Sequence, residues 1–414
     1  MTEKSASALW AGAGKNCLGQ TSTEAGAPCV VRVVGPSIWP VAAAPHGGIT
    51  RRSLLGSLPA AWLAACSGGG TMQQANGVDL EAYPTVAPGP APGASVQARD
   101  MARSLGRGVN FGNMLEPPSE GAWGLRVEDR FINLVGTPGF PTTVRLPVRW
   151  SNHADVDAAA RIDTAFMARV TEVVDKLLAR GATVVLNMHH YRQLDGDPLD
   201  PGERGVDEAV VDLRFLALWR QIAEHFAGHS PRLLFEIYNE PHGRLDARWN
   251  DLLSRAVRAV RASNPQRLLV AGPVVWNNPT GLPRLVLPAD AHMILTVHHY
   301  EPFNYTHQGA EWANPPKPTG VGCCDVGQLA AMHRLLDVAV SECARLGYPV
   351  FVGEFGAYNK ASTASRVTYS RAMRDAMEAR GMPWMYWELA AGFGVYDPVA
   401  GALRTELAAA LFGA

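Results

Sequence analysis

From about residue 105 onward, short apolar runs alternate with longer stretches of helical periodicity. The runs are apolar almost without interruption, which is typical of parallel strands that are covered on both faces. They predict eight strands, at Gly108–Phe111, Thr142–Pro147, Thr183–Met188, Leu233–Tyr238, Leu268–Ala271, Met293–His298, Val350–Gly353 and Trp384–Trp387. The periodic stretches predict helices at Ile162–Ala179, Glu208–His225, Trp249–Ala262, Gln328–Leu346, Arg366–Arg380 and Leu403–Phe412.

This alternation predicts an α/β fold, a (β/α)8 TIM barrel that forms a single catalytic domain over residues 101–414. An open doubly wound sheet is the alternative, but no Gly-x-Gly-x-x-Gly follows the first predicted strand. Gly181, Gly347 and Gly381 stand where helices should end and can adopt the left-handed cap. In such a barrel the chemistry collects at the carboxyl ends of the strands.

The first hundred residues differ from the rest, because they are rich in Ala, Gly, Pro and Ser and show neither period. We expect a disordered segment there. Within it, Arg51-Arg52 precedes an apolar stretch that ends at Cys66, and its length of about a dozen residues matches a signal peptide rather than a membrane span. The pair resembles a twin-arginine signal, and Leu63-Ala64-Ala65-Cys66 resembles a lipoprotein box with Cys66 as the lipidated residue.

These segments predict an exported protein, which is periplasmic, secreted or anchored to a membrane through lipidated Cys66. Residues 50–66 would be the signal and residues 67–100 a Gly/Pro-rich linker. A chance Arg pair before a small core helix is the alternative. Residues 1–49 are an anomalous extension for a targeting signal, and no Met lies between Met1 and Met72. A true start near Val41 would explain them.

The charge balance changes the picture of possible partners. Lys and Arg number 37 and Asp and Glu 38, for a net charge of -1, which becomes -4 when residues 1–65 are removed. Such a chain has no basic field for nucleic-acid phosphates, and a neutral substrate suits it. We expect a monomer.

The cysteines predict no disulfide framework. Of six, three remain after Cys66: Cys323, Cys324 and Cys343. A bridge from Cys343 to either of the other two, or free thiols near a loop, are both open.

Ionisable or amide side chains directly follow six of the eight predicted strands. Two are carboxylates, Glu240 after strand four and Glu354 after strand seven, which can meet across the barrel mouth. A pair of carboxylates, one acid and one nucleophile, is what glycoside hydrolysis requires. Glu236, four residues before Glu240, is expected to be a structural carboxylate deeper in the barrel.

Several strings, in this order, resemble glycoside hydrolase family 5, the cellulase family of clan A, over about residues 105–412. The most specific begins at Leu233 and reads Leu-Leu-Phe-Glu-Ile-Tyr-Asn-Glu-Pro-His. The others start at Gly108 (Gly-Val-Asn-Phe-Gly-Asn), Val144 (Val-Arg-Leu-Pro-Val), His298 (His-His-Tyr-Glu-Pro-Phe), Gly353 (Gly-Glu-Phe-Gly) and Trp384 (Trp-Met-Tyr-Trp-Glu).

The resemblance implies a retaining endo-β-1,4-glucanase, with Glu240 as acid/base and Glu354 as nucleophile. It places Arg145, Asn239, His298 and Tyr300 around them, with Arg145 holding the pKa of Glu354 low. It also implies substrate-binding residues, which are His189, His190, Trp387, Asn110, Glu116, Trp276 and Trp312. No metal and no cofactor is expected.

Other functions remain open on the same residues. A β-mannanase, a mixed-linkage glucanase or a xyloglucanase would use the same catalytic group and differ in its loops. A non-catalytic carbohydrate-binding barrel is the remote alternative, and the intact carboxylate pair argues against it. The expected partner is therefore a polysaccharide, with β-glucan first.

Overall fold

Eight parallel strands close into a barrel in the computed structural model, which describes residues 92–313 and 315–413. They follow one another around the barrel in chain order, and β1 pairs with both β2 and β8. The strands are β1 (Arg107–Asn110), β2 (Thr143–Leu146), β3 (Thr183–Asn187), β4 (Leu233–Glu236), β5 (Leu269–Ala271), β6 (Met293–His298), β7 (Val350–Phe355) and β8 (Trp384–Tyr386). All eight predicted strands and the predicted TIM barrel are confirmed.

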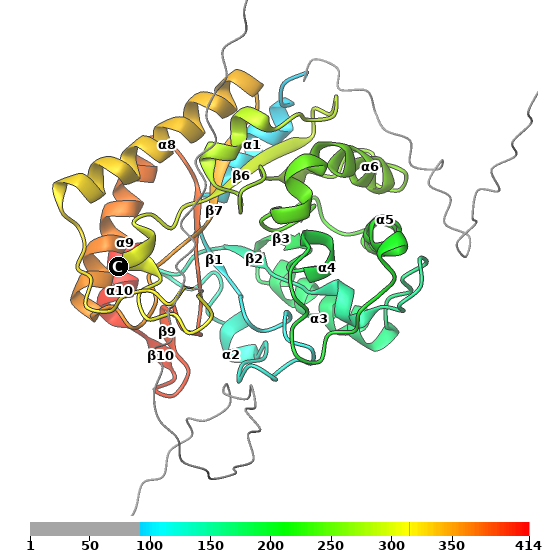
Figure 1. The fold of residues 1–414 in the computed structure, drawn as a ribbon. Helices are drawn as coiled ribbons and strands as arrows, with labels where there is room; N and C mark the ends of the chain where they lie inside the picture. Colours follow the sequence, from blue (N-terminus) through cyan, green and yellow to red (C-terminus); the bar gives the residue numbers. More distant parts are fainter. Residues whose placement is uncertain (1–91, 314, 414) are drawn as a thin grey trace, which may run out of the picture. The chain divides into compact units, whose positions relative to one another are not determined.

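Helices follow most strands and lie around the barrel (Figure 1). The longer ones are α3 (Thr164–Ala179), α5 (Val211–His225), α6 (Trp249–Arg261), α8 (Val326–Leu346), α9 (Thr363–Glu378) and α10 (Thr405–Phe412). Each matches a predicted helix to within a few residues. Short helices α2 (Asp129–Ile132), α4 (Arg192–Asp195) and α7 (Phe303–Thr306) lie in the loops, and after β5 the connection is a 3-10 helix, η5 (Pro279–Arg284).

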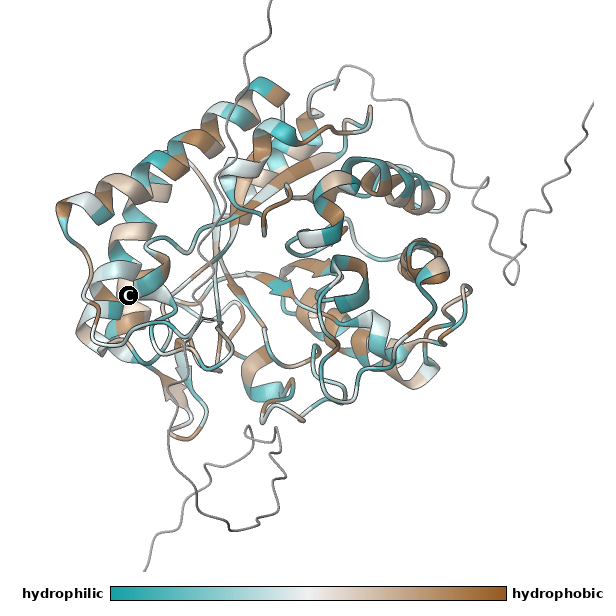
Figure 2. Cartoon of the chain, in the orientation of Figure 1, coloured by the Kyte–Doolittle hydropathy of each residue, from teal (hydrophilic) through white to brown (hydrophobic). Residues whose placement is uncertain are grey.

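The outer helices form where the apolar period and the end signals agree. In α3 the buried residues are Val170, Val173, Val174 and Leu177, which is the i, i+3, i+4, i+7 spacing of one helix face. Apolar and polar residues alternate in the same way along α8 (Figure 2). Helix α8 begins with a capping box between Asp325 and Gln328 and ends at Gly347 in the left-handed conformation, as predicted.

A helix that the sequence did not predict, α1 (Val96–Leu105), precedes the first strand. Its first residues belong to the predicted linker, so the structured domain begins earlier than residue 101. Ser95 caps it, and the Ala94 N–H donates to the Gly347 carbonyl just before β7, which places α1 at the amino-terminal end of the barrel. Because it buries only Ala98, Ala102 and Leu105, its apolar period is weak.

Three buried tryptophans stabilise the opposite end, where the strands finish. The indole N–H of Trp150 donates to the carbonyl of Asn187, that of Trp219 to Ile237 and that of Trp249 to Gly272, at 2.8–3.0 Å. Each bond satisfies a carbonyl at or just beyond the end of β3, β4 or β5, where the ladder stops. The loops that carry the polar motifs therefore start from a rigid rim.

The predicted signal, Cys66 and most of the linker lie outside the described residues, as do residues 1–49. In the part of the chain that the structure describes, none of the helices combines the length and apolarity that crossing a membrane requires.

Candidate active site

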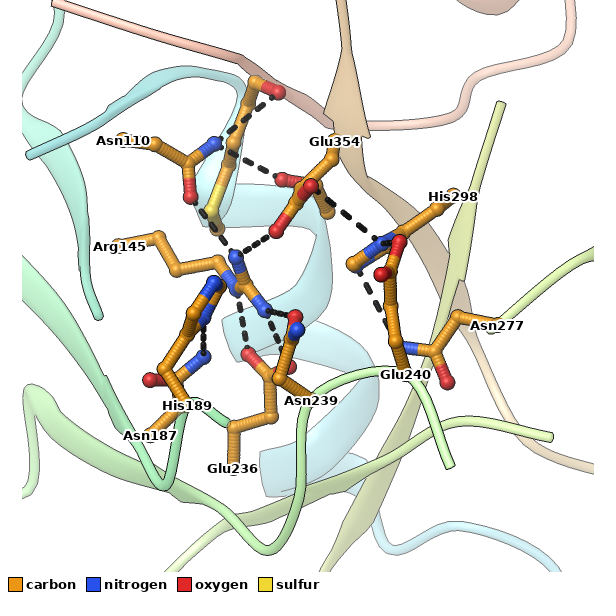
Figure 3. A network of polar contacts seen from close by, with 12 residues as sticks. Asn110, Arg145, Asn187, His189, Glu236, Asn239, Glu240, Asn277, His298 and Glu354 are labelled. Carbon is orange, nitrogen blue, oxygen red and sulfur yellow. Dashed lines mark hydrogen bonds and ion pairs between the residues drawn. The ribbon is translucent and has the colours of Figure 1, made fainter. Parts of the chain in front are cut away.

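The barrel brings polar residues from four strands to one point at its carboxyl-terminal end. Arg145 lies in β2, His298 is the last residue of β6 and Glu354 lies in β7. Glu240 lies four residues beyond the end of β4, on the loop that the Asn-Glu-Pro string forms. The predicted catalytic residues are therefore neighbours in space (Figure 3).

Arg145 is the centre of this group and is completely buried. Its Nε and Nη2 donate to the two carboxylate oxygens of Glu236, each at 2.7 Å. Nη1 donates to Glu354 Oε1 at 2.5 Å, and Nη2 also donates to Asn239 Oδ1 at 2.7 Å. Because a guanidinium is planar and forked, these contacts orient all three partners at once. Glu236 is the structural carboxylate that the sequence predicted.

The two carboxylates of the predicted pair face each other. One oxygen of Glu240, one of Glu354 and one ring nitrogen of His298 all lie within 4.8 Å of one another. Tyr300 donates its hydroxyl to Glu354 Oε2 at 2.9 Å. His298 Nδ1 lies 2.7 Å from Glu240 Oε1 and 3.5 Å from Glu354 Oε2. The limit of 4.8 Å on the distance between the two carboxylate oxygens lies below the roughly 6.5–9.5 Å of inverting glycosidases and agrees better with the roughly 5–5.5 Å of retaining ones.

Burial decides the protonation of this group. It raises the pKa of Glu240 to about 7, and it lowers the pKa of His298 to about 4, so that this imidazole is neutral near pH 7. Burial also raises the pKa of Glu354, although His298 and Arg145 act to lower it. The expectation that Arg145 would hold the pKa of Glu354 below its usual value is therefore wrong, because the loss of solvent outweighs the ion pair.

The loop after β5 supports the pair from the side, through a residue that the sequence did not single out. Val275, Trp276 and Asn277 all have positive φ, from 54° to 66°. Asn277 Nδ2 lies 3.3 Å from His298 Nε2 and donates to it, so the His298 hydrogen is on Nδ1 and points at Glu240. The amide fits because residue 272 is glycine; a Cβ there would lie 2.1 Å from Asn277 Oδ1. No local sequence signal marks Asn277.

His189, His190 and Trp387 lie together on the β3 and β8 side of the cleft. The rings of His189 and Trp387 stack at 5.4 Å and 4°, and His190 meets His189 edge to face at 4.3 Å. Trp387 is partly exposed, whereas burial keeps the pKa of His189 well below its usual value. Gly112 lies against the Trp387 ring, where a Cβ would come within 2.7 Å. The arrangement agrees with an aromatic platform beside the carboxylates.

Two predicted substrate residues, Asn110 and Glu116, do not face the cleft. Asn110 is completely buried; its Oδ1 accepts from Arg145 Nη1 at 2.9 Å, and its Nδ2 donates to the Gly353 carbonyl at 3.0 Å. The carboxylate of Glu116 is buried too and accepts from the backbone N–H groups of the three preceding residues, at 2.6–3.0 Å. The polar atoms of both side chains are hydrogen-bonded within the protein, so these residues support the site and do not contact substrate in the cleft.

The amide of this loop that remains partly exposed is Asn113, whose side chain hydrogen-bonds to Glu388. Glu388 is buried and also accepts from the N–H groups of Ala391 and Phe393, each at 3.1 Å. The first and last loops of the barrel are thereby joined beside Trp387. Spacing along the sequence does not show which of Asn110 and Asn113 keeps its side chain partly exposed.

Trp276 and Trp312 are the most exposed aromatic residues among those predicted to bind substrate. Trp276, on the β5 loop, is 52% exposed and stacks on His242. Trp312, on the β6 loop, is 60% exposed and packs edge to face on Tyr358 at 4.8 Å. They lie on different loops and expose aromatic surface, and their role in substrate binding stays a prediction.

Among the described residues, one group of His and carboxylate side chains converges closely enough to suit a metal ion, and it is Glu240, His298 and Glu354. Each already has a protein partner, and the cationic Arg145 lies against Glu354. The expectations of no metal and no cofactor stay predictions.

The cysteine pairing differs from both expectations. Cys323 and Cys324 form a disulfide with each other, just before α8, and Cys343 is a buried free thiol. Burial raises the pKa of the Cys343 thiol to about 12, which makes it unreactive. Sequence spacing alone does not indicate a bridge between adjacent residues.

Comparisons with known proteins agree with this geometry. Residues 106–392 match the model of the cellulase family, glycosyl hydrolase family 5. Endoglucanase H of Acetivibrio thermocellus is 32% identical over 326 residues, which are 77% of this chain and 34% of that protein. Cellulase/esterase CelE of the same organism is 29% identical, with 73% of this chain and 37% of that protein covered. The chain thus spans about a third of the length of these relatives.

Two of the solved structures that match are covered almost completely by this chain. One described as an endoglucanase has a TM-score of 0.72 and 37% identity, over 77% of this chain and all of that one. Thermotoga maritima Cel5A, solved with cellobiose and also with mannotriose, has a TM-score of 0.71 and 36% identity, over 76% of this chain and 99% of its own.

Proposed function

This chain belongs to glycosyl hydrolase family 5, the cellulase family, and we propose that it is a retaining endo-β-1,4-glucanase with Glu240 as acid/base and Glu354 as nucleophile. The observation that carries the proposal is the pair itself, with oxygens of both carboxylates within 4.8 Å and only Glu354 touching Arg145 and Tyr300. Arg145 and Tyr300 favour the ionised form of Glu354 against the effect of burial, whereas Glu240, beside a neutral imidazole, is suited to keep its proton.

In the first step, Glu354 attacks the anomeric carbon while Glu240 gives its proton to the departing glycosidic oxygen. The C1–oxygen bond to the leaving sugar breaks as the bond from C1 to a Glu354 oxygen forms. His298 Nδ1–H occupies Glu240 Oε1, which leaves Oε2 as the oxygen that can carry the proton. Arg145 Nη2 occupies Asn239 Oδ1, so the Asn239 Nδ2 group can donate to the sugar 2-hydroxyl in the transition state.

In the second step, Glu240 acts as the base. Once Glu354 is an uncharged ester, its negative charge no longer opposes ionisation of Glu240, so the pKa of Glu240 falls. Glu240 then takes a proton from water, the water oxygen bonds to C1, and the ester bond to Glu354 breaks. Two displacements on one carbon return the β configuration.

Two observations support a β-1,4-glucan as the substrate: the names of the relatives and the exposed aromatic side chains near the site. The relatives are named endoglucanases, and the exposed rings of Trp276 and Trp312 suit the apolar faces of β-linked pyranose units. A β-1,4-mannan is the second candidate, because Cel5A was solved with mannotriose as well as cellobiose. Mixed-linkage glucan and xyloglucan are the other members of the class.

A substrate panel tests the proposal directly. Purified protein is incubated with carboxymethylcellulose, barley β-glucan, mannan, glucomannan and xyloglucan, and reducing ends are measured. Cleavage of the β-1,4-glucans is expected, with the β-anomer as the first product seen by NMR. Activity on mannan alone would replace the substrate, a first α-anomer would overturn the retaining mechanism, and no activity on any β-glycan would favour a non-catalytic carbohydrate-binding barrel.

We also propose that the enzyme is exported and anchored through a lipid on Cys66. The described chain begins at the end of the barrel opposite the carboxylates, where Ala94 contacts Gly347, so a tether entering there leaves the cleft accessible. Metabolic labelling with an alkyne fatty acid should mark the wild type, and Cys66→Ser should release unlabelled protein from membranes. Membrane-free, unlabelled wild-type protein would contradict the anchor.

A further inference from the structure

His242, two residues after Glu240, contacts the backbone of the acid/base residue. Its Nδ1 lies 2.6 Å from the Glu240 carbonyl oxygen. Because a carbonyl can only accept, Nδ1 carries the hydrogen. Glu240 itself has a φ of 51°, a left-handed conformation that costs a non-glycine residue about 1–3 kcal/mol and persists only where the surroundings hold it. A bond to the Glu240 carbonyl sets the plane of the peptide that follows this residue, and hence the direction of its side chain.

The other side of the His242 ring contacts the loop that follows β3, through two aspartates. Nε2 lies 3.3 Å from Asp197 Oδ2, and Asp195 Oδ1 lies 3.7 Å from Nδ1. Asp195 is buried and is held by the Tyr238 hydroxyl at 2.6 Å. Gly243, with a φ of 57°, allows the close approach, since a Cβ there would lie 2.5 Å from the Asp195 carbonyl oxygen. Both ring nitrogens of His242 therefore have acceptors.

The face of the His242 ring stacks on Trp276 from the β5 loop. The ring centroids are 4.5 Å apart and the planes differ by 19°. Trp276 is 52% exposed, whereas the His242 side chain is only 12% exposed, so the indole has one face on the imidazole and is otherwise open. The backbone N–H of Trp276 also donates to the Pro241 carbonyl at 3.3 Å. Three loops thus meet at His242.

We propose that His242 is a positioning residue for the leaving-group half of the cleft: it orients Glu240 through the backbone and holds Trp276 as the platform for the departing sugar. The inference rests on the proposed function, in which Glu240 protonates that sugar. Trp276 contacts Pro241 and His242, the two residues that follow Glu240 in the chain, whereas Trp387 follows β8, on the other side of the barrel from β4. His242 therefore acts on departure of the leaving group and has no contact with the nucleophile.

The experiment compares two substrates with different leaving groups, which depend to different degrees on the acid/base residue and on Trp276. Cellotetraose needs a protonated leaving oxygen and a sugar bound beyond the cleavage point. 2,4-Dinitrophenyl β-cellobioside needs neither, because its phenolate leaves without a proton. His242→Phe keeps the ring stack and loses both hydrogen bonds; His242→Asn keeps a donor near Nδ1 and loses the stack.

Each variant should lower kcat/KM for cellotetraose about ten- to a hundredfold more than for the dinitrophenyl substrate. His225→Phe is the matched control, since this imidazole ends α5 at the other end of the barrel, and it should leave the ratio of the two kcat/KM values at the wild-type value. Equal losses on both substrates, or a wild-type ratio in both His242 variants, would refute the inference. Wild-type protein that cleaves neither substrate would instead refute the proposed function.

A fluorescence titration separates positioning from a purely structural role. Burial disfavours the charged imidazole, but Asp195 and the other acceptors outweigh it and raise the pKa of His242 above its usual value. The charged and titratable groups facing it are Asp195, Asp197, Arg192, His190 and Glu240. A protonated imidazole quenches a stacked indole, so tryptophan emission should rise from acid to alkaline pH with a midpoint above the usual imidazole value of about 6.5, and the step should vanish in His242→Phe. A step that persists in that variant would contradict the stack.

If His242→Phe does not fold, Asp197→Asn carries the same test. Asp197 is partly exposed and supplies a charged acceptor for Nε2, so the weaker, neutral acceptor of asparagine should shift the substrate ratio in the same direction by about threefold. An unchanged ratio in folded Asp197→Asn protein would refute the role of this contact.

Discussion

Glu354 and Glu240 face each other across a few ångströms, yet they are held in different ways. Glu354 lies within β7, its side chain is 5% exposed, and its partners Arg145 and Tyr300 come from β2 and from just beyond β6. Glu240 lies on a loop with a φ of 51°, its side chain is 23% exposed, and its partner is a neutral histidine. The barrel strands thus hold the proposed nucleophile, and the loops hold the proposed acid/base.

This difference shows how one fold separates two carboxylates of the same type. A residue on a strand is placed by the ladder and paired with a buried cation, so its charge is compensated. A residue on a loop has no such cation, and burial keeps its proton on up to about pH 7. It also follows that the leaving-group half can change through its loops while the nucleophile half stays constant.

The largest expected effect comes from removing the nucleophile. Glu354→Ala should lower kcat on glucan by at least about a thousandfold, because no covalent intermediate can form. With sodium azide and an activated aryl cellobioside, the variant should release an α-glycosyl azide, since azide attacks from the vacated face. The anomer is read by NMR. A β-azide would mean that the two roles are exchanged.

Glu240→Ala should have the next largest effect. Loss of the general acid and base should cost about a hundred- to a thousandfold on glucan, whereas the first step on 2,4-dinitrophenyl β-cellobioside should remain fast and appear as a burst of dinitrophenol. Azide should then give a β-glycosyl azide by attacking the ester on Glu354. Loss of the burst together with the glucan activity would argue against an acid/base role.

Substitution of Arg145, the buried cation beside Glu354, should have a smaller effect than loss of either carboxylate. Arg145→Met leaves Glu236 and Glu354 buried without a cation, so we expect a loss of roughly 3–5 kcal/mol in the free energy of unfolding, together with low activity. Chemical denaturation measures the first. Arg145→Lys keeps the charge but not the fork and should fall between. Arg130→Met, which removes an exposed ion pair with Glu128, is the control and should change little.

The pH dependence of kcat/KM should show the smallest effect, and it tests the protonation of Glu240. Catalysis needs Glu240 protonated and Glu354 ionised, so kcat/KM on glucan should fall above about pH 7 as Glu240 loses its proton, by about tenfold per unit. The acid limb should lie above the usual range of a glutamate, because the pKa of Glu354 is raised. With Glu240→Gln and the dinitrophenyl substrate, the alkaline limb should disappear. Its persistence would assign that limb to another group.

Much of the barrel and the identity of the central pair were predictable from the sequence. Runs such as Val184–Leu186 are buried on both faces and have to be strands of a covered parallel sheet. Once eight such strands are expected, the polar residues that follow them must gather at one end. Helix α1 was missed because its buried residues are few and mostly alanine.

The sequence by itself therefore determined the eight-stranded barrel, the place of Glu240 and Glu354 at its mouth and the predicted role of Glu236, because each follows from local apolar runs and the strand order. Only the tertiary structure decided that Asn110 and Glu116 are buried supports, that Asn277 contacts His298 and His242 contacts the Glu240 backbone, and that Cys323 pairs with Cys324. These outcomes depend on which side chains lose water and which distant partners they meet. Desolvation and contacts between loops are properties of the folded chain, and the spacing of residues along the sequence does not predict them.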